Sequence, residues 1–417
     1  MNDLSKFSLA DKETASCPFD YYEAMRSQDP VHFDDKAGCY IVSRYADITE
    51  ALGQPMIYSS ALGFEKQQRS EHAAEIDDFY KSQGVPAMKS VVVADPPYHT
   101  RIRSLMDKAF TAHRVASMEA YITKVAAELI EPLRKTGKME FMGDFAIPFP
   151  IYIIADQLGV PRSEFKTFRR WSDATVEPLG RMLSRERSLW CAEQMVEMWH
   201  YVQKTTEDRR ANPADDMITD LVEARIDDPE NPTLTEEELF HVVRAFIVAG
   251  NETTTTAISN AMLLLARDPS LADKMVGEID DDRSFSRFAE EVLRLESPVQ
   301  GLPRIATQDT KLGGVNIPEG ALVILGYGSA NRDDAKFECP ERFDHTRRNV
   351  GQHLAFGGGI HRCIGAMLAR MEIKVATREI LRHLTDIRLD IPEDEIRYAP
   401  SMLVRALTRL PLSFRVR

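Results

Sequence analysis

Near its carboxyl end the chain reads Phe356-Gly-Gly-Gly-Ile-His-Arg-Cys363-Ile-Gly365-Ala366. A single cysteine, Cys363, follows a glycine-rich loop and precedes a helical pattern that runs from Ala366 to Leu384. A sulfur at the start of a helix lies near unpaired backbone N–H groups and the positive end of the helix dipole, and both favour the thiolate. The thiolate is the form that binds metal, so a metal ligand is one explanation of this pattern, and a buried cysteine in a glycine-rich turn is the other. Glycine has no Cβ, so this loop can lie close to a flat ligand.

The composition is that of a globular protein with a large core. The chain has 417 residues, of which 43% are hydrophobic and 28% are charged. No linker, repeat or low-complexity tract divides it, so we expect one domain over residues 1–417. The net charge of −13 argues against nucleic acid or an anionic membrane surface as a partner.

Cysteine usage and the N-terminal sequence indicate where the protein works. The five cysteines are scattered and odd in number, which favours a reducing cytoplasm over a disulfide framework. The first residues lack an apolar signal core, and no run approaches the roughly 18 apolar residues of a membrane span. We therefore expect a cytoplasmic protein without a membrane anchor.

Hydrophobic periodicity predicts a mainly α-helical fold with small β-sheets. Thr235-Glu-Glu-Glu238 is a capping box, which predicts a long helix from there to Arg267. Turn signals at Gly313-Gly314 and at Pro318-Glu-Gly320 predict a small sheet over residues 305–323. The other expected elements are a strand over 37–43, a helix over 45–52, further helices between 97 and 235, and strands over 401–407 and 412–416.

The long helix contains a segment that is poorly suited to a helix. It reads Ala249-Gly250-Asn251-Glu252-Thr253-Thr254-Thr255-Thr256. Threonine loses side-chain freedom in a helix, and glycine costs about 1 kcal/mol relative to alanine. A contact between helices that needs small residues is one explanation. A functional site is the other, because local sequence conflicts of this kind occur at such sites.

Both segments resemble motifs of the cytochrome P450 family. The spacing Phe-x-x-Gly-x-His-x-Cys-x-Gly is similar to the family's haem-binding loop, and Ala-Gly-x-Glu-Thr is similar to its oxygen-binding groove. The resemblance covers essentially the whole chain. It implies the fold of the soluble bacterial members, a helix-rich prism with haem between a long central helix and the helix after the cysteine loop.

The resemblance also implies the cofactor and the catalytic residues. The cofactor is haem b, with the Cys363 thiolate as the axial ligand of the iron. Glu252 and Thr253 are the catalytic residues that deliver protons to bound dioxygen, because a carboxyl exchanges protons and a hydroxyl both donates and accepts.

Further residues match positions that hold the haem in the family. Glu291-Val-Leu-Arg294 and Arg342, in Phe337-Glu-Cys-Pro-Glu-Arg342-Phe343, correspond to a buried structural triad. The resemblance implies that propionates are bound by His99, Arg103, Arg304 and His361. It adds Phe356, Gly365, Ala249 and Gly250 as further cofactor contacts.

The implied activity is hydroxylation of a hydrophobic small molecule with dioxygen and two electrons. No Rossmann or flavin fingerprint is present, so the electrons must come from an external donor. The resemblance implies a ferredoxin-type donor with its reductase. Two basic segments could attract such an acidic partner: Arg101, Arg103, Lys108, His113 and Arg114 in one, and Arg347, Arg348, Arg362 and Arg370 in the other.

Three alternatives stay open. A peroxide-driven hydroxylase of the same fold would not need the pair of Glu252 and Thr253. A nitric oxide reductase of the same fold would take electrons directly from a nicotinamide. A non-catalytic haem sensor, from a different class, would need no proton delivery, and no segment here resembles an attached output domain.

The resemblance also implies a substrate pocket. By correspondence with the family, it is formed by Val92 and its neighbours from Ala87 on, and by Ala245, Phe246, Val248, Ala249, Val299, Gln300, Leu302, Met402 and Leu403. Most of these are apolar, which suits a hydrophobic molecule held by shape. Lys89 or Arg405 could supply a positive anchor, and the polar segment from Ser60 to Ser90 could act as a lid.

Overall fold

The computed structural model describes residues 4–61, 72–86, 89–178 and 183–417. The chain divides into two compact units. Unit 1 comprises Met1–Gly63, Ser117–Phe149 and Thr253–Arg417, and unit 2 comprises Phe64–Ala116 and Pro150–Glu252. That residues 1–417 form one haem-binding domain stays a prediction, because the division into two compact units does not test haem binding.

Unit 1 contains a five-stranded sheet in the order β1-β2-β8-β5-β3. Its strands are β1 (Val31–Asp34), β2 (Cys39–Val42), β8 (Leu322–Leu325), β5 (Leu302–Ala306) and β3 (Tyr58–Ser59). Strands β2 and β8 pair in parallel, and the other neighbours are antiparallel. Side chains from all five strands, among them Val31, Val42 and Leu325, form one buried cluster with helix α3 (Tyr45–Leu52).

The smaller sheets of unit 1 agree only in part with the expectations. A hairpin joins β6 (Thr310–Leu312) to β7 (Val315–Ile317) through Gly313 and Gly314, both in the left-handed region. A three-stranded sheet has the order β4 (Lys138–Glu140), β10 (Pro411–Val416) and β9 (Leu384–Leu389). The predicted strand over 401–407 is wrong: the residues make only the isolated bridges Val299–Val404 and Tyr398–Leu407. Strand β4 was not predicted.

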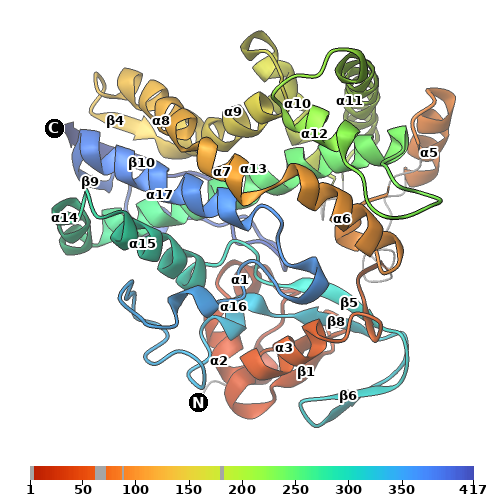
Figure 1. Ribbon diagram of the computed structural model, residues 1–417. Coiled ribbons are helices and arrows are strands. Elements are labelled where there is room, and N and C mark those ends of the chain that lie inside the picture. The colour runs from red at the N-terminus through yellow and green to blue at the C-terminus, as the bar shows by residue number, and fades with distance from the viewer. Residues whose placement is uncertain (1–3, 62–71, 87–88, 179–182) are drawn as a thin grey trace. The chain divides into compact units, whose positions relative to one another are not determined.

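Helices make up most of both units, which confirms the mainly α fold with small sheets. Those of unit 1 include α1 (Lys12–Ser16), α2 (Phe19–Gln28), α8 (Glu119–Leu133), α14 (Pro269–Gly277), α15 (Asp282–Leu295), α16 (Tyr327–Ala330) and α17 (Ala366–His383). Helix α17 packs against both α8 and α15 (Figure 1). The predicted helices over 45–52 and from Ala366 are confirmed.

Unit 2 consists of helices with short connections. They include α5 (Ala73–Ser82), α6 (Tyr98–Ala109), α10 (Phe165–Val176), α11 (Arg185–Ala211) and α12 (Met217–Glu223), while α7 (Ala112–Ser117) and α9 (Pro148–Gln157) lie at its limits. Helix α11 packs against α5, α10 and α12. The segment expected to be a polar loop from Ser60 to Ser90 contains helix α5. Its residues 62–71 and 87–88 lie outside the described part.

Helix α13 (Glu236–Arg267) begins at the predicted capping box. The Thr235 hydroxyl accepts from the N–H of Glu238 over 3.2 Å, and the Glu238 carboxylate accepts from the N–H of Thr235 over 3.0 Å. Residues up to Glu252 belong to unit 2 and those from Thr253 on belong to unit 1. Within the described ranges, neither this helix nor any other is long and apolar enough to span a bilayer.

Candidate active site

The cysteine loop is closed by a backbone hydrogen bond and contains two left-handed glycines. The N–H of Cys363 donates to the carbonyl of Phe356 over 2.9 Å, three residues before α17 begins. Gly357 has φ +63° and Gly359 has φ +61°, a region in which a side chain is strained. A Cβ on Gly359 would also lie 2.3 Å from the carbonyl oxygen of Leu52. The loop therefore requires glycine at position 359.

Cys363 is exposed, unlike two of the other cysteines. Cys39 and Cys191 are buried, and burial raises the pKa of their thiols to about 12 and about 11. Both therefore stay protonated at neutral pH. Gly365 is the N-cap of α17, and a Cβ there would be 3.9 Å from the Cys363 sulfur. An accessible sulfur at the start of a long helix is well placed to bind metal.

The aromatic ring of Phe356 packs against two side chains that share one carboxylate. The guanidinium carbon of Arg370 lies 4.4 Å from the ring centroid, and the His353 ring centroid lies 5.7 Å away. Both side chains bond to Glu290 on α15: His353 Nε2 is 2.9 Å from Oε2, and Arg370 donates to Oε1. Burial would raise the pKa of Glu290, but these hydrogen bonds outweigh it and lower the pKa to about 2.

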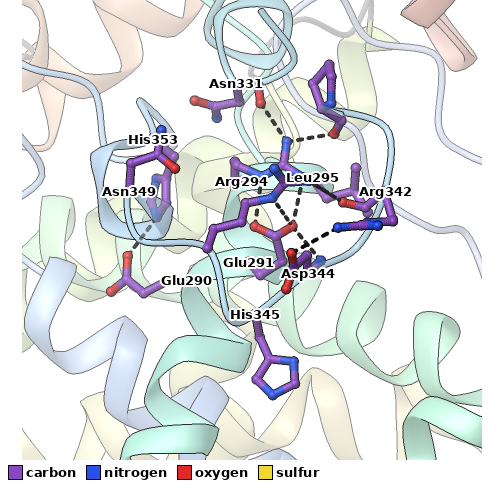
Figure 2. Close-up of polar contacts among 12 residues, drawn as sticks. Glu290, Glu291, Arg294, Leu295, Asn331, Arg342, Asp344, His345, Asn349 and His353 are labelled. Carbon is purple, nitrogen blue, oxygen red and sulfur yellow. Dashed lines mark hydrogen bonds and ion pairs between the residues drawn. The ribbon is translucent and has the colours of Figure 1, made fainter. Parts of the chain in front are cut away.

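A buried ion pair lies one residue further along α15 (Figure 2). Arg294 donates from Nε and Nη2 to the two carboxylate oxygens of Glu291, each over 2.8 Å, and neither side chain is exposed. Arg294 Nη1 also donates to the carbonyls of Asn331 and Pro340, each over 2.8 Å. The structure thus brings together two members of the proposed triad and uses the second one to hold the chain ahead of the cysteine loop.

The third member of this network is Arg347, and the assignment of Arg342 to the triad is wrong. Arg347 Nε donates to Glu291 Oε1 over 3.0 Å from a buried position. The Arg342 side chain is 70% exposed and pairs with Asp344 over 3.2 Å instead (Figure 2). Arg342 takes part only through its carbonyl, which accepts from Arg347 Nη2 over 2.7 Å. A guanidinium in water cannot neutralise a carboxylate in the interior.

The four threonines of α13 differ in accessibility. Thr253 and Glu252 are partly accessible, whereas Thr254, Thr255 and Thr256 are buried. The Thr255 hydroxyl donates to the Ala146 carbonyl over 3.0 Å. The first threonine is thus the one whose hydroxyl a small molecule could approach.

Accessible surface also extends over the residues before Glu252. Ala249 is exposed in a helix that is otherwise largely buried, and a Cβ on Gly250 would meet no atom within 4 Å. Asn251, between Gly250 and Glu252, is buried, and its side-chain amide donates to the Ser172 hydroxyl over 2.7 Å. Ala249 and Gly250 therefore leave open space beside α13, as the predicted cofactor contacts require.

A buried carboxyl on α17 faces the second threonine. Glu372 is 3% exposed and hydrogen-bonds to the Thr254 hydroxyl. Burial raises the pKa of Glu372 to about 8, against the smaller opposite effect of this hydrogen bond. Glu372 is therefore mainly a neutral carboxylic acid at pH 7, and it links α17 to α13 next to Thr253.

Of the four predicted propionate ligands, Arg304 has the most informative surroundings. It is 4% exposed, its Nη1 donates to the Pro303 carbonyl over 2.7 Å, and it hydrogen-bonds to the Tyr327 hydroxyl. No acidic side chain pairs with it among the residues described. A buried guanidinium needs a counter-charge, so these surroundings fit a carboxylate of a bound group such as a haem propionate.

The other predicted propionate ligands divide between the units. His361 is partly accessible in the cysteine loop of unit 1. In unit 2, His99 is buried on α6, and Arg103 on the same helix donates to Asp107 over 3.0 Å. Burial, and next the Arg103 charge, lower the pKa of His99. The assignments of these three residues to the propionates stay predictions.

The predicted pocket residues are not equally accessible. Partly or fully accessible are Val92, Ala245, Val248, Ala249, Val299, Leu302, Met402 and Leu403. Phe246 is buried, with its ring centroid 5.7 Å from that of Phe110. Gln300 is buried as well: its Nε2 donates to the Ser297 carbonyl over 2.6 Å, and its amide packs on Gly328. Gln300 is therefore removed from the proposed pocket. Ala87 lies outside the described residues.

Sequence reasoning missed four side chains of this region. Arg347 was assigned to the surface, although the doublet Arg347-Arg348 leaves open which of the two is buried. His353 and Glu290 carry no distinctive local pattern. Glu372 had a usable signal: it occupies a buried helix face with Ile373 and Ala376, where an acidic residue is unusual.

Comparisons with known proteins agree with this geometry. Residues 184–397 match the family model described as cytochrome P450. The chain is 34% identical to cytochrome P450 109 of Bacillus spizizenii over 95% of this chain and 91% of the relative, and 32% identical to the vitamin D(3) 25-hydroxylase of Pseudonocardia autotrophica over 95% and 93%. The solved structure of cytochrome P450 CYP109Q5 from Chondromyces apiculatus superposes with a TM-score of 0.86, 32% identity and coverage of 99% and 98%. The chain belongs to the cytochrome P450 family and is a monooxygenase.

Proposed function

We propose that this monooxygenase hydroxylates a hydrophobic small molecule with electrons from an external redox partner. The observation that carries the proposal is the accessible pair of Glu252 and Thr253 on α13, next to exposed Ala249 and open Gly250. A peroxide-driven enzyme or a haem sensor would have no use for an acid and a hydroxyl at such a position. The vitamin D(3) 25-hydroxylase, whose name denotes a large apolar substrate, supports this substrate class.

In the proposed mechanism the residues of the chain have separate tasks. Cys363 would bind the haem iron through its thiolate, and Phe356, Arg304 and His361 would hold the haem; His99 and Arg103 are the other two residues proposed to bind its propionates. The haem supplies the activation of dioxygen when it is bound. Glu252 exchanges protons with water, and the Thr253 hydroxyl passes them on by donating and accepting in turn. The apolar residues Ala245, Val248 and Ala249 exclude water from the substrate.

The substitution Thr253→Ala tests proton delivery. We expect nearly unchanged substrate binding, measured as a haem spin-state shift, because only one hydroxyl and one methyl group are removed. The share of electrons released as hydrogen peroxide should rise at the expense of hydroxylated product.

The matched control is Thr256→Val. Its hydroxyl is buried without a hydrogen-bond partner in the described part of the chain, so its removal should leave the ratio of product to peroxide unchanged. Tight coupling in Thr253→Ala would contradict the assignment of Thr253.

Several of the basic residues proposed to bind an acidic ferredoxin form ion pairs within the chain. Of the expected basic residues, Arg347 and Arg370 pair with Glu291 and Glu290. Arg101, Arg103 and Arg114 also have acidic partners, which are Glu238, Asp107, and Asp215 with Asp220. Charge already paired within the chain attracts a partner only weakly. Arg348 and Arg362 are both exposed in unit 1, so their side chains are accessible to a partner, and we place the ferredoxin contact there.

We expect the double substitution Arg348→Glu and Arg362→Glu to slow reduction by ferredoxin and to weaken its dependence on salt. Arg388→Glu, an exposed arginine of β9, is the control and should reduce at the normal rate. Equal rates for all three proteins would contradict the docking surface. NADH consumption by the protein alone would instead support a nitric oxide reductase.

A further inference from the structure

Arg244 on α13 is a cation that no carboxylate among the described residues neutralises. Its Nε atom is buried and has no hydrogen-bond partner in the described ranges. Burial lowers the pKa of Arg244, and among the described residues Tyr80 on α5 is the neighbour that opposes this effect. No carboxylate of the described residues compensates the guanidinium. A second arginine with this property, Arg304, is accounted for by the haem, but Arg244 belongs to unit 2 and has no assigned role.

The neighbouring phenol does not act as a counter-ion either. Burial raises the pKa of Tyr80 to about 12, and the charge of Arg244 only partly opposes this effect. Tyr80 is therefore neutral at physiological pH. The Arg244 side chain is partly accessible but its Nε is buried, and a cation partly removed from water is stabilised by a bound anion. The counter-charge is expected to come from a ligand.

Arg244 lies at one end of an accessible stripe on α13. Arg244, Ala245 and Val248 are partly accessible and Ala249 is exposed. The neighbouring residues on the other side of the helix are buried, each at most 5% exposed: Val242, Val243, Phe246 and Ile247. Residues four apart lie on one helix face, so the stripe continues from Arg244 through Val248 to Glu252. Its central part is apolar, and its far end carries the proposed proton-delivery pair.

The dimensions suit an elongated molecule. Thr253 lies nine positions after Arg244, which corresponds to about 13 Å along the helix axis. A ligand with an anionic group at Arg244 would lay its apolar body along Ala245, Val248 and Ala249. Its other end would come to the level of Thr253, where the proposed function places oxidation.

We propose that Arg244 anchors the substrate and that the substrate is an elongated hydrophobic molecule with one carboxylate. One guanidinium matches one carboxylate in charge and offers a two-pronged set of donors. The carboxylate anchors considered from sequence are weaker candidates. Arg405 is buried and donates to Glu296, and Lys89 lies 5.9 Å from the centre of the Tyr98 ring. The inference deepens the proposed function and rests on it for the site of oxidation.

The test compares carboxylic acids with their methyl esters. Dissociation constants are measured for a panel of straight-chain and aryl-alkyl acids, including dodecanoate, and for the matching esters. The haem-loaded protein is titrated by spin-state shift and by equilibrium dialysis. We expect the wild-type protein to bind the best acid about tenfold more tightly than its ester. In Arg244→Gln this preference should disappear, while the ester affinity stays within about twofold of wild type.

Two further variants make the result specific. Arg244→Lys retains the charge and should retain most of the preference. Arg210→Gln removes an exposed arginine of α11 that pairs with Glu236, and the preference should be unchanged. The inference is overturned if no acid of the panel is preferred over its ester, or if Arg244→Gln keeps the preference. A protein without a thiolate-type haem spectrum would contradict the proposed function instead, because dialysis measures the preference without using the haem.

Discussion

Two arginines five residues apart, Arg342 and Arg347, have opposite surroundings. Arg347 is buried against Glu291 and also donates to the carbonyls of Cys339 and Arg342, each over 2.7 Å. Arg342 extends into solvent beside Asp344. A local motif predicts that one arginine of this segment reaches Glu291. It does not predict which one, because the choice depends on how residues 338–347 turn.

The substitution Arg347→Ala should be far more damaging than Arg342→Ala. Removing Arg347 leaves part of a buried carboxylate uncompensated, so we expect a loss of about 3–5 kcal/mol in the free energy of unfolding, together with reduced haem content. Removing the exposed Arg342 should cost less than about 1 kcal/mol. Urea unfolding and the ratio of haem to protein measure both effects. Equal losses in the two variants would contradict the corrected triad.

At the scale of elements, the carboxyl-terminal helices position the cysteine loop. Glu290 and Glu291 are adjacent on α15: Glu290 binds one side chain from before the loop and one from after it, and Glu291 binds Arg347 from before the loop. Glu290 holds His353 and Arg370 against Phe356, and Glu291 holds Arg347 and Arg294. Glu290 and Glu291 thereby hold both the segment before the loop and Phe356, the residue with which the loop begins. Helix α17 adds a second link, from Glu372 to Thr254 on α13.

Glu372 makes stability depend on pH. Its pKa is about 8 in the folded protein and near 4.5 when solvated, so the folded state retains a proton that the unfolded state loses. This contribution is complete below pH 4.5 and falls as the pH rises to about 8, by at most about 1.4 kcal/mol per pH unit. Glu372→Gln, which mimics the neutral acid, should therefore be more stable than wild type at pH 8.

Thermal unfolding between pH 5 and 8.5 measures this effect. The difference between Glu372→Gln and the wild type should grow with pH, whereas Glu319→Gln, at an exposed position, should follow the wild-type curve. Parallel curves for wild type and Glu372→Gln would show that Glu372 is not held neutral by the fold.

For the molecule as a whole, the sequence predicted local elements better than distant contacts. The capping box at Thr235, the helix ending before Gly53 and the turn at Gly313-Gly314 depend on neighbouring residues, and all three are present. Strand β4 is three residues long and exists because β10 pairs with it, which no local pattern reveals. The same holds for Gln300, which is held by the Ser297 carbonyl, and for Arg244, whose Nε has no hydrogen-bond partner among the described residues.

The central claim is that Cys363 supplies the thiolate ligand of the haem iron. It is tested most directly by the absorption spectrum of the ferrous carbon monoxide complex in Cys363→His and in Cys17→Ser, which alters another exposed cysteine. The account predicts a thiolate-type spectrum for the wild type and Cys17→Ser, and an imidazole-type spectrum for Cys363→His. A thiolate-type spectrum that survives in Cys363→His would contradict the account.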